Sequence, residues 1–263
     1  MTRIGIIGFG FIGQALFKRI AADGPALGLD VAFVHARAGR SGPVPENLFC
    51  PDLGRFADHA PDLIVEVAHP DITLRHAAAF LRRSDYMPLS LTALAEPGVL
   101  DTLQDAAREG GHRLLVASGA LVGLESLLAG RADWTDVRIT FRKHPRNIDW
   151  TLTGRDPATI AGPTIIYQGP VRGIAPMFPR NVNTMVACAL ATTGLDRCQA
   201  RLVADPALDV AVAEVEATGH SGARLQTAKQ VPAVGVSGTE MIASVLHSIR
   251  RAAGQAGKTL EYV

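Results

Sequence analysis

Apolar and polar positions follow two periods that alternate through the first half of the chain. Short apolar runs rich in β-branched residues, typical of buried strands, alternate with segments in which apolar residues recur with helical period. The runs are Arg3–Ile7, Leu29–His35, Pro61–Ala68, Met87–Leu91 and Arg113–Val116, and the helical segments begin near Phe11, Ile72 and Pro97. Strands that alternate with helices in this way form parallel sheets with right-handed crossovers. The pattern therefore predicts an α/β fold with an N-terminal Rossmann-type parallel sheet.

The pattern changes after Ser118. The later runs predict strands at Val137–Arg142, Thr164–Gln168, Gln199–Ala204 and Val210–Thr218, with helices over Leu124–Ala132 and from Asn183 to about Thr193. We therefore expect one domain over residues 1–119 and a second, α+β domain over residues 120–237 that carries the substrate, catalytic and oligomerisation surfaces. A last amphipathic helix, within about 238–263, is expected to pack back on the first domain or on another subunit.

A glycine-rich turn joins the first predicted strand to the first predicted helix. It consists of Gly8, Phe9, Gly10, Phe11, Ile12 and Gly13. In this context Gly8 serves the tight turn, Gly10 lets the backbone approach a pyrophosphate, and Gly13 lets the helix pack closely on the strand. The pyrophosphate then rests on the free N–H groups at the start of the helix. An ordinary glycine-rich turn is the alternative, but the strand before and the helix after favour dinucleotide binding.

The end of the second predicted strand is where such a domain selects its cofactor. A carboxylate there binds the adenosine ribose 2′-hydroxyl of NAD, whereas an arginine accommodates the 2′-phosphate of NADP. Here the strand ends in His35, Ala36 and Arg37, with Arg40 close behind. These residues favour NADP over NAD, unless both arginines are ordinary solvated loop charges. The expected cofactor is therefore NADP or NAD.

Composition narrows the class of partner. The chain has 263 residues, a net charge of +1 and scattered basic residues, which is unlike a nucleic-acid binder and favours a small-molecule substrate. Cys50, Cys188 and Cys198 lack the spacing of a disulfide framework or a zinc site, so no metal is expected. There is no signal-peptide pattern and no apolar run of membrane-spanning length. We expect a cytoplasmic enzyme that needs no membrane and, by default, forms a symmetric homo-oligomer.

Several motifs in order along the chain resemble the L-aspartate dehydrogenase family, which is related in architecture to dihydrodipicolinate reductases. They are the glycine-rich turn, the segment from Ser90 to Glu96 (SLTALAE), Ser118-Gly119-Ala120 with Gly123, Arg142-Lys143, the segment from Phe178 to Asn183 (FPRNVN), and Ala204-Asp205-Pro206 followed by residues 214–219. The resemblance implies a Rossmann domain with a second α+β domain. It also implies that Ala120 and Asn183 contact the nicotinamide cofactor.

The chain departs from this family at the position of the catalytic histidine. The family has an asparagine and a histidine, two residues apart, before a strand of the form Glu-hydrophobic-Glu. Aligned without gaps, these positions fall on Ala211 and Ala213. Because an alanine cannot exchange a proton, the acid–base role of the histidine cannot be carried over.

Other residues are candidates for proton transfer or ligand contacts. His220, in the turn after the strand, either re-enters the cleft or is a solvated turn residue. Lys143 and His144 either act on the substrate or form a solvated strand end, and Arg180 either clamps an anionic substrate or forms a surface ion pair. Glu66 is a polar residue near the end of a predicted buried strand, and His69 follows that strand; either borders the nicotinamide, or His69 is a turn residue with a satisfied hydrogen bond.

Three functions remain open at this point. The first is an NAD(P)-dependent dehydrogenase of amino-acid metabolism that acts on the CH–NH₂ group of an amino acid or on its imino or oxo acid, with aspartate as the default substrate. The second is a reductase of a different imine or carbonyl compound. The third is a dinucleotide-binding protein without catalysis. The two alanines keep the second and third open, whereas the glycine-rich turn, Ala120, Lys143 and Asn183 favour an active oxidoreductase.

Overall fold

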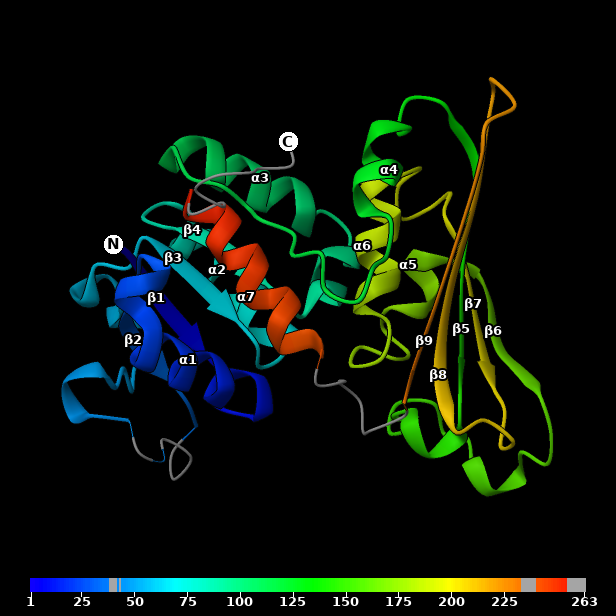
Figure 1. Cartoon of the computed structure of the whole chain (residues 1–263), viewed down its shortest axis with the longest axis horizontal. Helices are drawn as coiled ribbons and strands as arrows, with labels where there is room; N and C mark the ends of the chain where they lie inside the picture. Colours follow the sequence, from blue (N-terminus) through cyan, green and yellow to red (C-terminus); the bar gives the residue numbers. More distant parts are fainter. Residues whose placement is uncertain (38–41, 43, 233–239, 255–263) are drawn as a thin grey trace. The chain divides into compact units, whose positions relative to one another are not determined.

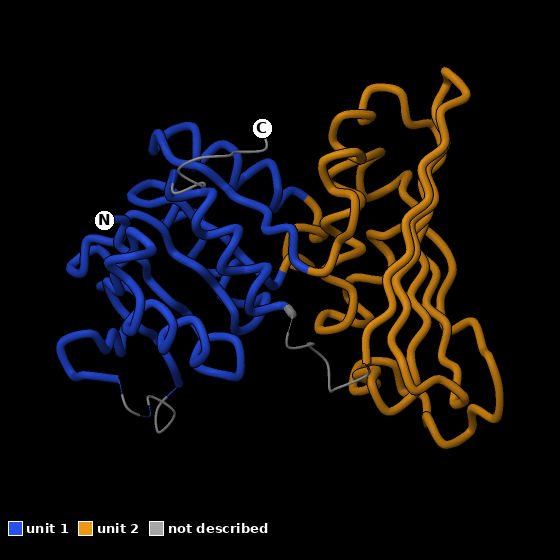
Figure 2. The backbone as a smooth tube through the Cα atoms, viewed as in Figure 1, with its two compact units in different colours: residues 1–90, 98–119, 240–263 blue, residues 91–97, 120–239 orange. Residues whose placement is uncertain are grey.

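The structure is a computed structural model that describes residues 1–37, 42, 44–232 and 240–254. The chain divides into two compact units, shown in Figure 2. Unit 1 comprises residues 1–90, 98–119 and 240–263, and unit 2 comprises residues 91–97 and 120–239. Each unit is described by itself below.

Unit 1 contains a parallel four-stranded sheet in the order β2-β1-β3-β4 (Figure 1). The strands are β1 (Thr2–Ile7), β2 (Leu29–His35), β3 (Leu63–Glu66) and β4 (Asp85–Pro88), and the helices are α1 (Phe11–Leu27), α2 (Pro70–Leu81), α3 (Val99–Gly110) and α7 (Glu240–Ala252). Helices α1 and α7 contact each other, and α2 contacts α3. The predicted Rossmann-type parallel sheet is confirmed. The chain moves from β2 to β3 across β1, so the direction of winding reverses beside β1.

Burial explains why these segments form strands. The last four residues of β1 and all four residues of β3 are buried, as expected for strands covered on both faces. On one face, Ile4 and Ile6 belong to a core cluster with Leu16 of α1 and with Val245 and Ile249 of α7. The last helix therefore contributes apolar side chains to the core of unit 1.

One predicted strand is wrong. The run Arg113–Val116 is not a strand, because only Leu114 forms an isolated bridge, to Tyr86 of the short strand β4. The strand predicted over Pro61–Ala68 is also shorter than expected, since β3 ends at Glu66. Both differences have the same cause. An apolar run predicts that a segment is buried, but a strand also needs a neighbouring backbone with which it can form hydrogen bonds.

Unit 2 is a mixed five-stranded sheet in the order β6-β7-β5-β8-β9, with helices on one face (Figure 1). The strands are β5 (Trp134–Lys143), β6 (Thr164–Pro170), β7 (Gln199–Ala204), β8 (Val210–Gly219) and β9 (Arg224–Pro232), and the helices are α4 (Leu124–Ala129), α5 (Val171–Ile174) and α6 (Asn183–Ala191). Strand β5 is parallel to β7 and antiparallel to β8. The expected second sheet is confirmed.

Two parts of unit 2 are not apparent from the hydrophobic pattern. Strand β9 is an edge strand whose residues alternate between exposed and half-buried, so it lacks the apolar run that marks the other strands. The segment of residues 91–97, inside the range assigned to the first domain, groups with unit 2. It contains the short 3₁₀ helix η3 (Leu91–Ala95), whose Ala95 carbonyl accepts a hydrogen bond from Arg172 at 2.6 Å.

Candidate functional site

The glycine-rich turn of unit 1 has the backbone geometry that its glycines predict. Gly8 has φ = 103°, and a Cβ atom there would lie 2.9 Å from the carbonyl of Val67. A Cβ atom on Gly13 would overlap the carbonyl oxygen of Gly8, so α1 lies too close to the turn for any residue but glycine at this position. A Cβ atom on Gly10, by contrast, would meet nothing within 4 Å. Gly8 and Gly13 are therefore required by the fold, whereas Gly10 leaves open space in front of the helix.

The N-terminus of α1 is suited to an anion. No side chain caps the helix at Gly10, and its first turn carries no acidic residue. The free N–H groups and the positive end of the helix therefore remain for a ligand. Beside this end, Phe9 is buried against Phe17, Ile12 is half-buried against the core, and Phe11 is exposed. The turn thus fits the pyrophosphate of a dinucleotide, with Gly10 as the point of close approach.

The end of β2 carries the predicted cofactor-selecting residues. His35 is held by its Nδ1 atom, which lies 2.7 Å from the carbonyl oxygen of Cys50. Arg37 follows the strand and is exposed, whereas Arg40 lies outside the described residues. The described end of β2 therefore presents an arginine to solvent.

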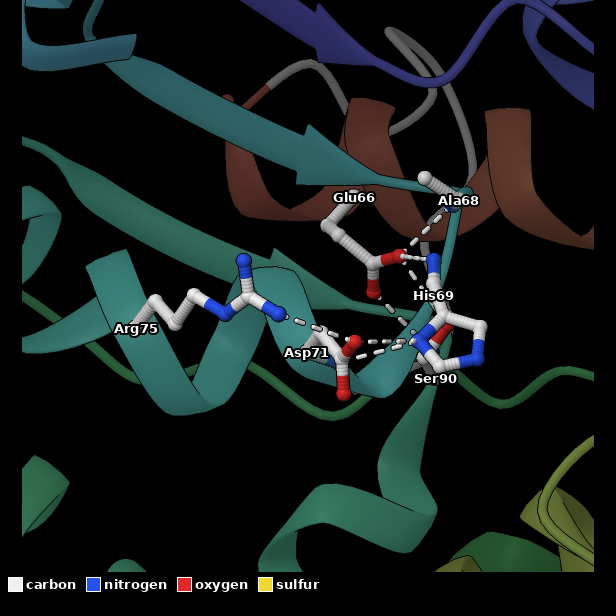
Figure 3. A network of polar contacts seen from close by, with 6 residues as sticks. All are labelled: Glu66, Ala68, His69, Asp71, Arg75 and Ser90. Carbon is white, nitrogen blue, oxygen red and sulfur yellow. Dashed lines mark hydrogen bonds and ion pairs between the residues drawn. The ribbon is translucent and has the colours of Figure 1, made fainter. Parts of the chain in front are cut away.

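The end of β3 is organised by a fully buried carboxylate, that of Glu66 (Figure 3). Its Oε1 atom accepts hydrogen bonds from the N–H of Ala68 at 2.6 Å, the N–H of His69 at 2.7 Å and the hydroxyl of Ser90 at 2.9 Å. Its Oε2 atom accepts one from the N–H of Ser90 at 3.1 Å. Burial raises the pKa of Glu66 above its usual value, and these four donors oppose the shift. Glu66 thereby ties the turn after β3 to the end of β4.

His69 caps helix α2 from this turn. Its Nδ1 atom accepts a hydrogen bond from the N–H of Asp71 at 3.2 Å, and its side chain is 55% exposed. Arg75 holds Asp71 from the next turn of the helix at 3.2 Å. His69 therefore serves the turn, and its ring also reaches solvent at the edge of the sheet where dinucleotides bind.

In unit 2, Lys143 is the last residue of β5. Its Nζ atom lies 5.2 Å from the centre of the Phe141 ring, and burial lowers the pKa of Lys143 to about 8. Phe141 pairs with Ala213 of β8. Because side chains alternate between the faces of a sheet, Phe141, Lys143 and Ala213 share one face. The structure therefore brings Lys143 to the part of the sheet where the family's histidine is replaced by alanine.

The two residues predicted to contact the nicotinamide also lie in unit 2. Ala120 is half-buried at the start of the unit. Asn183 begins helix α6, and its Oδ1 atom accepts a hydrogen bond from the N–H of Thr92 at 3.2 Å. The hydroxyl of Thr92 in turn donates to the carbonyl of Pro179 at 3.1 Å. Asn183 therefore also anchors the segment that contains η3.

Two further candidates have local structural roles. The Nδ1 atom of His144 accepts a hydrogen bond from the N–H of Arg146 at 3.0 Å and caps a short 3₁₀ helix, η4 (Pro145–Asn147). Arg180 forms an ion pair with Asp149 at 3.4 Å and is mostly exposed. The contact of Arg180 is the surface ion pair that the sequence left open as an alternative, whereas His144 is half-buried and holds the turn after β5.

His220 lies at the far end of the sheet from Lys143. It follows β8 directly, in the hairpin at the upper end of the sheet in Figure 1, and its N–H donates to the carbonyl of Asp133 at 3.0 Å. It lies seven positions beyond Ala213 along an extended strand, roughly 23 Å at the usual rise per residue. It lines a separate open hollow of about 580 Å³ with Arg131 and Arg197. The structure therefore does not bring His220 to Lys143 or Ala213.

Sequence reasoning missed part of this arrangement. It singled out Glu66 as a polar residue in an apolar strand but did not find its partner Ser90, which lies 24 residues away in the chain. It also missed the role of Asn181, which is buried, accepts from the N–H of Asp149 at 2.8 Å and donates to the carbonyl of Asn147 at 3.0 Å. For Glu66 the available signal was a polar residue in an otherwise apolar segment, whereas Asn181 stands among other polar residues and gave no such signal.

Two classes of feature are absent from the described part of the chain. No group of three or more histidine, cysteine, aspartate or glutamate side chains there is arranged to hold a metal ion. Within the same residues, none of the helices has the length and apolar character needed to cross a membrane.

Comparison with known proteins gives matches along most of the chain. Residues 8–117 match the family model described as homoserine dehydrogenase, NAD binding domain, and residues 127–252 match that described as aspartate dehydrogenase, C-terminal. An aspartate dehydrogenase domain-containing protein of Xenopus tropicalis is 35% identical, over 97% of this chain and 96% of its own. An L-aspartate dehydrogenase of Ralstonia nicotianae is 34% identical, over 84% of this chain and 86% of its own.

The fold is also similar to that of a solved structure. The crystal structure of aspartate dehydrogenase from Thermotoga maritima superposes with a TM-score of 0.74 at 22% identity and covers 100% of both chains. At this identity the similarity shows the fold, and it agrees with the Rossmann-type sheet and the second sheet described above.

Proposed function

The chain belongs to the aspartate dehydrogenase family, and we propose that it is a nicotinamide-dependent dehydrogenase that transfers hydride between the cofactor and an amino acid or its imino or oxo acid. The observation that carries the proposal is the glycine-rich turn, with open space at Gly10 in front of an uncapped helix. Aspartate, with oxaloacetate and ammonia in the reverse direction, is the first substrate pair to test.

The chain's own residues support a nicotinamide cofactor. Gly8, Gly10 and Gly13 shape the turn that would hold the pyrophosphate, and Ala120 and Asn183 match the family positions that contact the nicotinamide. When bound, the nicotinamide supplies or accepts the hydride. Arg37, exposed after β2, favours NADP over NAD because a guanidinium suits a 2′-phosphate.

The protein must also supply or remove a proton, and we assign this role to Lys143. Its ammonium lies over an aromatic ring, and no described residue forms an ion pair with it. Burial without a counter-charge lowers the pKa of Lys143 to about 8, near the range where a group works well as both acid and base. In the reductive direction the protonated amine donates, so the rate falls as pH rises through about 8. In the oxidative direction the neutral amine accepts, so the rate rises through the same pH.

The direct test is oxidation of NADH and NADPH, followed by nicotinamide absorbance, across a panel of 2-oxo acids with and without ammonia. Ammonia-dependent turnover with oxaloacetate supports an aspartate dehydrogenase. The pH profile of kcat then reports the proton-transfer group. The His220→Ala variant is the matched control, because His220 lies at the other end of the sheet, and we expect its rate to equal that of the unchanged protein.

A second candidate function has an observation of its own. Ala213 faces the same side of the sheet as Phe141, where the family's catalytic histidine would stand, and Lys143 and Lys229 lie on that face as well. An alanine in place of the histidine favours an imine or carbonyl substrate that is less polar than oxaloacetate. Turnover on the panel with such a compound, but not with oxaloacetate and ammonia, identifies this function.

Tight binding of NADH or NADPH without turnover on any compound points to a non-catalytic dinucleotide-binding protein.

A further inference from the structure

The turn after β3 lies directly against the glycine-rich turn. A Cβ atom on Gly8 would lie 2.9 Å from both the carbonyl group of Val67 and the Cβ atom of Ala68, and the N–H of Val67 donates to the carbonyl of Ile7 at 2.8 Å. The two strand exits are thus in contact inside unit 1. A ligand held at the N-terminus of α1 therefore has the residues after β3 as its immediate neighbours.

Sheet order decides which half of a dinucleotide reaches these residues. In a Rossmann sheet the pyrophosphate rests above β1 and the adenosine ribose lies at the end of β2. Strand β3 lies on the opposite side of β1 from β2. The other half, the nicotinamide and its ribose, therefore extends toward the end of β3, where His69 has an exposed polar side chain.

The hydrogen bonds of His69 determine which ring nitrogen carries a proton. The Nδ1 atom accepts from the N–H of Asp71, so in the neutral ring the proton is on Nε2. In the charged ring Nε2 is protonated as well. No described residue accepts a hydrogen bond from Nε2, and Figure 3 shows it on the side of the ring turned away from Asp71. His69 thus offers an N–H donor to a ligand in either charge state.

From this geometry we propose that the Nε2–H of His69 donates a hydrogen bond to an oxygen of the nicotinamide riboside half of the cofactor, and that Glu66 is the residue that positions it. Glu66 is fully buried and cannot touch the cofactor, but it holds the backbone N–H groups of Ala68 and His69. Its contacts with Ser90 attach the same turn to β4. The proposal rests on the proposed function, because it assumes a nicotinamide cofactor.

The test compares ligands that contain or lack the group that His69 would contact. NADH, ADP-ribose and ADP are titrated into the unchanged protein and into His69→Ala. We expect His69→Ala to weaken NADH binding by about tenfold, as for one hydrogen bond, and to change ADP binding by less than about twofold. A loss with ADP-ribose as well places the contact on the ribose, whereas unchanged ADP-ribose binding places it on the carboxamide. The control is His76→Ala, on the same helix, where the ring stacks on Phe80 and binding of all three ligands is expected to stay unchanged.

The role of Glu66 is tested with a double-mutant cycle. If Glu66 acts through His69, Glu66→Gln weakens NADH binding in the unchanged protein but adds nothing in the His69→Ala background. A merely structural role would weaken binding by the same factor in both backgrounds. Should Glu66→Gln fail to fold, Ser90→Ala replaces it, since it removes only the hydroxyl donor at 2.9 Å. Ser84→Ala removes a buried hydrogen bond of 2.8 Å to Pro61, just before β4, and is the matched control.

The outcomes separate this proposal from the proposed function. If NADH and NADPH fail to bind the unchanged protein, the proposed function is contradicted. If NADH binds but His69→Ala weakens NADH and ADP equally, or neither, the contact assigned to His69 is wrong while the proposed function stands. Additive effects of the Glu66 and His69 substitutions overturn the positioning role alone.

Discussion

The ends of strands β3 and β5 carry charged groups in different environments: Glu66 is fully buried, whereas Lys143 is half-buried. The Glu66 carboxylate, after β3 in unit 1, accepts hydrogen bonds from four donors. The Lys143 ammonium, at the end of β5 in unit 2, has an aromatic ring 5.2 Å away and no ion pair among the described residues. A buried charge with a full set of partners holds its surroundings in place. One without such partners remains available to a substrate.

The largest effect is expected from removing the group that lacks partners. Lys143→Met keeps the length of the stem but removes the amine, so turnover should fall by about 10²-fold or more while NADH affinity and thermal stability stay near those of the unchanged protein. Steady-state kinetics with a cofactor titration measure both. Lys143→Arg is the companion variant: because a guanidinium stays protonated, the fall in reductive rate above about pH 8 should disappear. A normal rate for Lys143→Met would rule out the assigned role.

Removing the group with many partners should act on stability instead. Glu66→Ala leaves four hydrogen-bond donors without their acceptor, which we expect to lower the free energy of unfolding by about 3 kcal/mol. Denaturant titration measures the loss, and Ser84→Ala provides the scale for a single buried hydrogen bond. If Glu66→Ala were no less stable than Ser84→Ala, the four hydrogen bonds to Glu66 would stabilise the fold no more than a single buried hydrogen bond, and the stabilising role given to Glu66 would be wrong.

A smaller effect concerns the pH dependence of stability. Burial raises the pKa of Glu66 in the folded protein above its ordinary value of 4.5, so between the two pKa values the folded state binds more protons than the unfolded state. The contribution of Glu66 to stability therefore falls as pH rises from about 4.5 to the folded pKa, and it is level above that. Glu66→Gln removes this titration. The difference in unfolding free energy between the two proteins, measured from about pH 4 to 8, should follow that curve; a constant difference would contradict it.

The smallest effect concerns the aromatic ring beside Lys143. Phe141→Leu keeps an apolar neighbour but removes the ring, whose face favours the charged amine. The pKa that governs the pH profile of kcat should then fall by about half a unit, since a cation–π contact of this kind contributes somewhat less than one pKa unit. Phe33→Leu, a buried ring of unit 1, is the control for loss of an aromatic residue. An upward shift would mean that the ring disfavours the charge.

Some features of the candidate site could be predicted from local sequence patterns, and others could not. The glycine-rich turn was predictable because the positions of its glycines follow from the steric requirements of a strand, a tight turn and a helix that are adjacent in the sequence. The alignment to the family located Lys143 and Ala213, but only the pairing of Phe141 with Ala213 shows that they share one face. His220 was chosen because it is seven residues from Ala213 in sequence, and an extended strand converts that short separation into a long distance.

The architecture could be predicted from the sequence: a parallel Rossmann-type sheet followed by a second sheet, and a turn shaped for a dinucleotide. These follow from hydrophobic period and from glycine sterics, which act over neighbouring residues. Three features could be seen only in the folded chain: Ser90 donates to Glu66, β9 pairs as an edge strand, and residues 91–97 group with unit 2. Hydrogen-bond partners and burial depend on segments that are distant in the chain. The residues of a short segment do not indicate which distant segment it will contact in the folded protein.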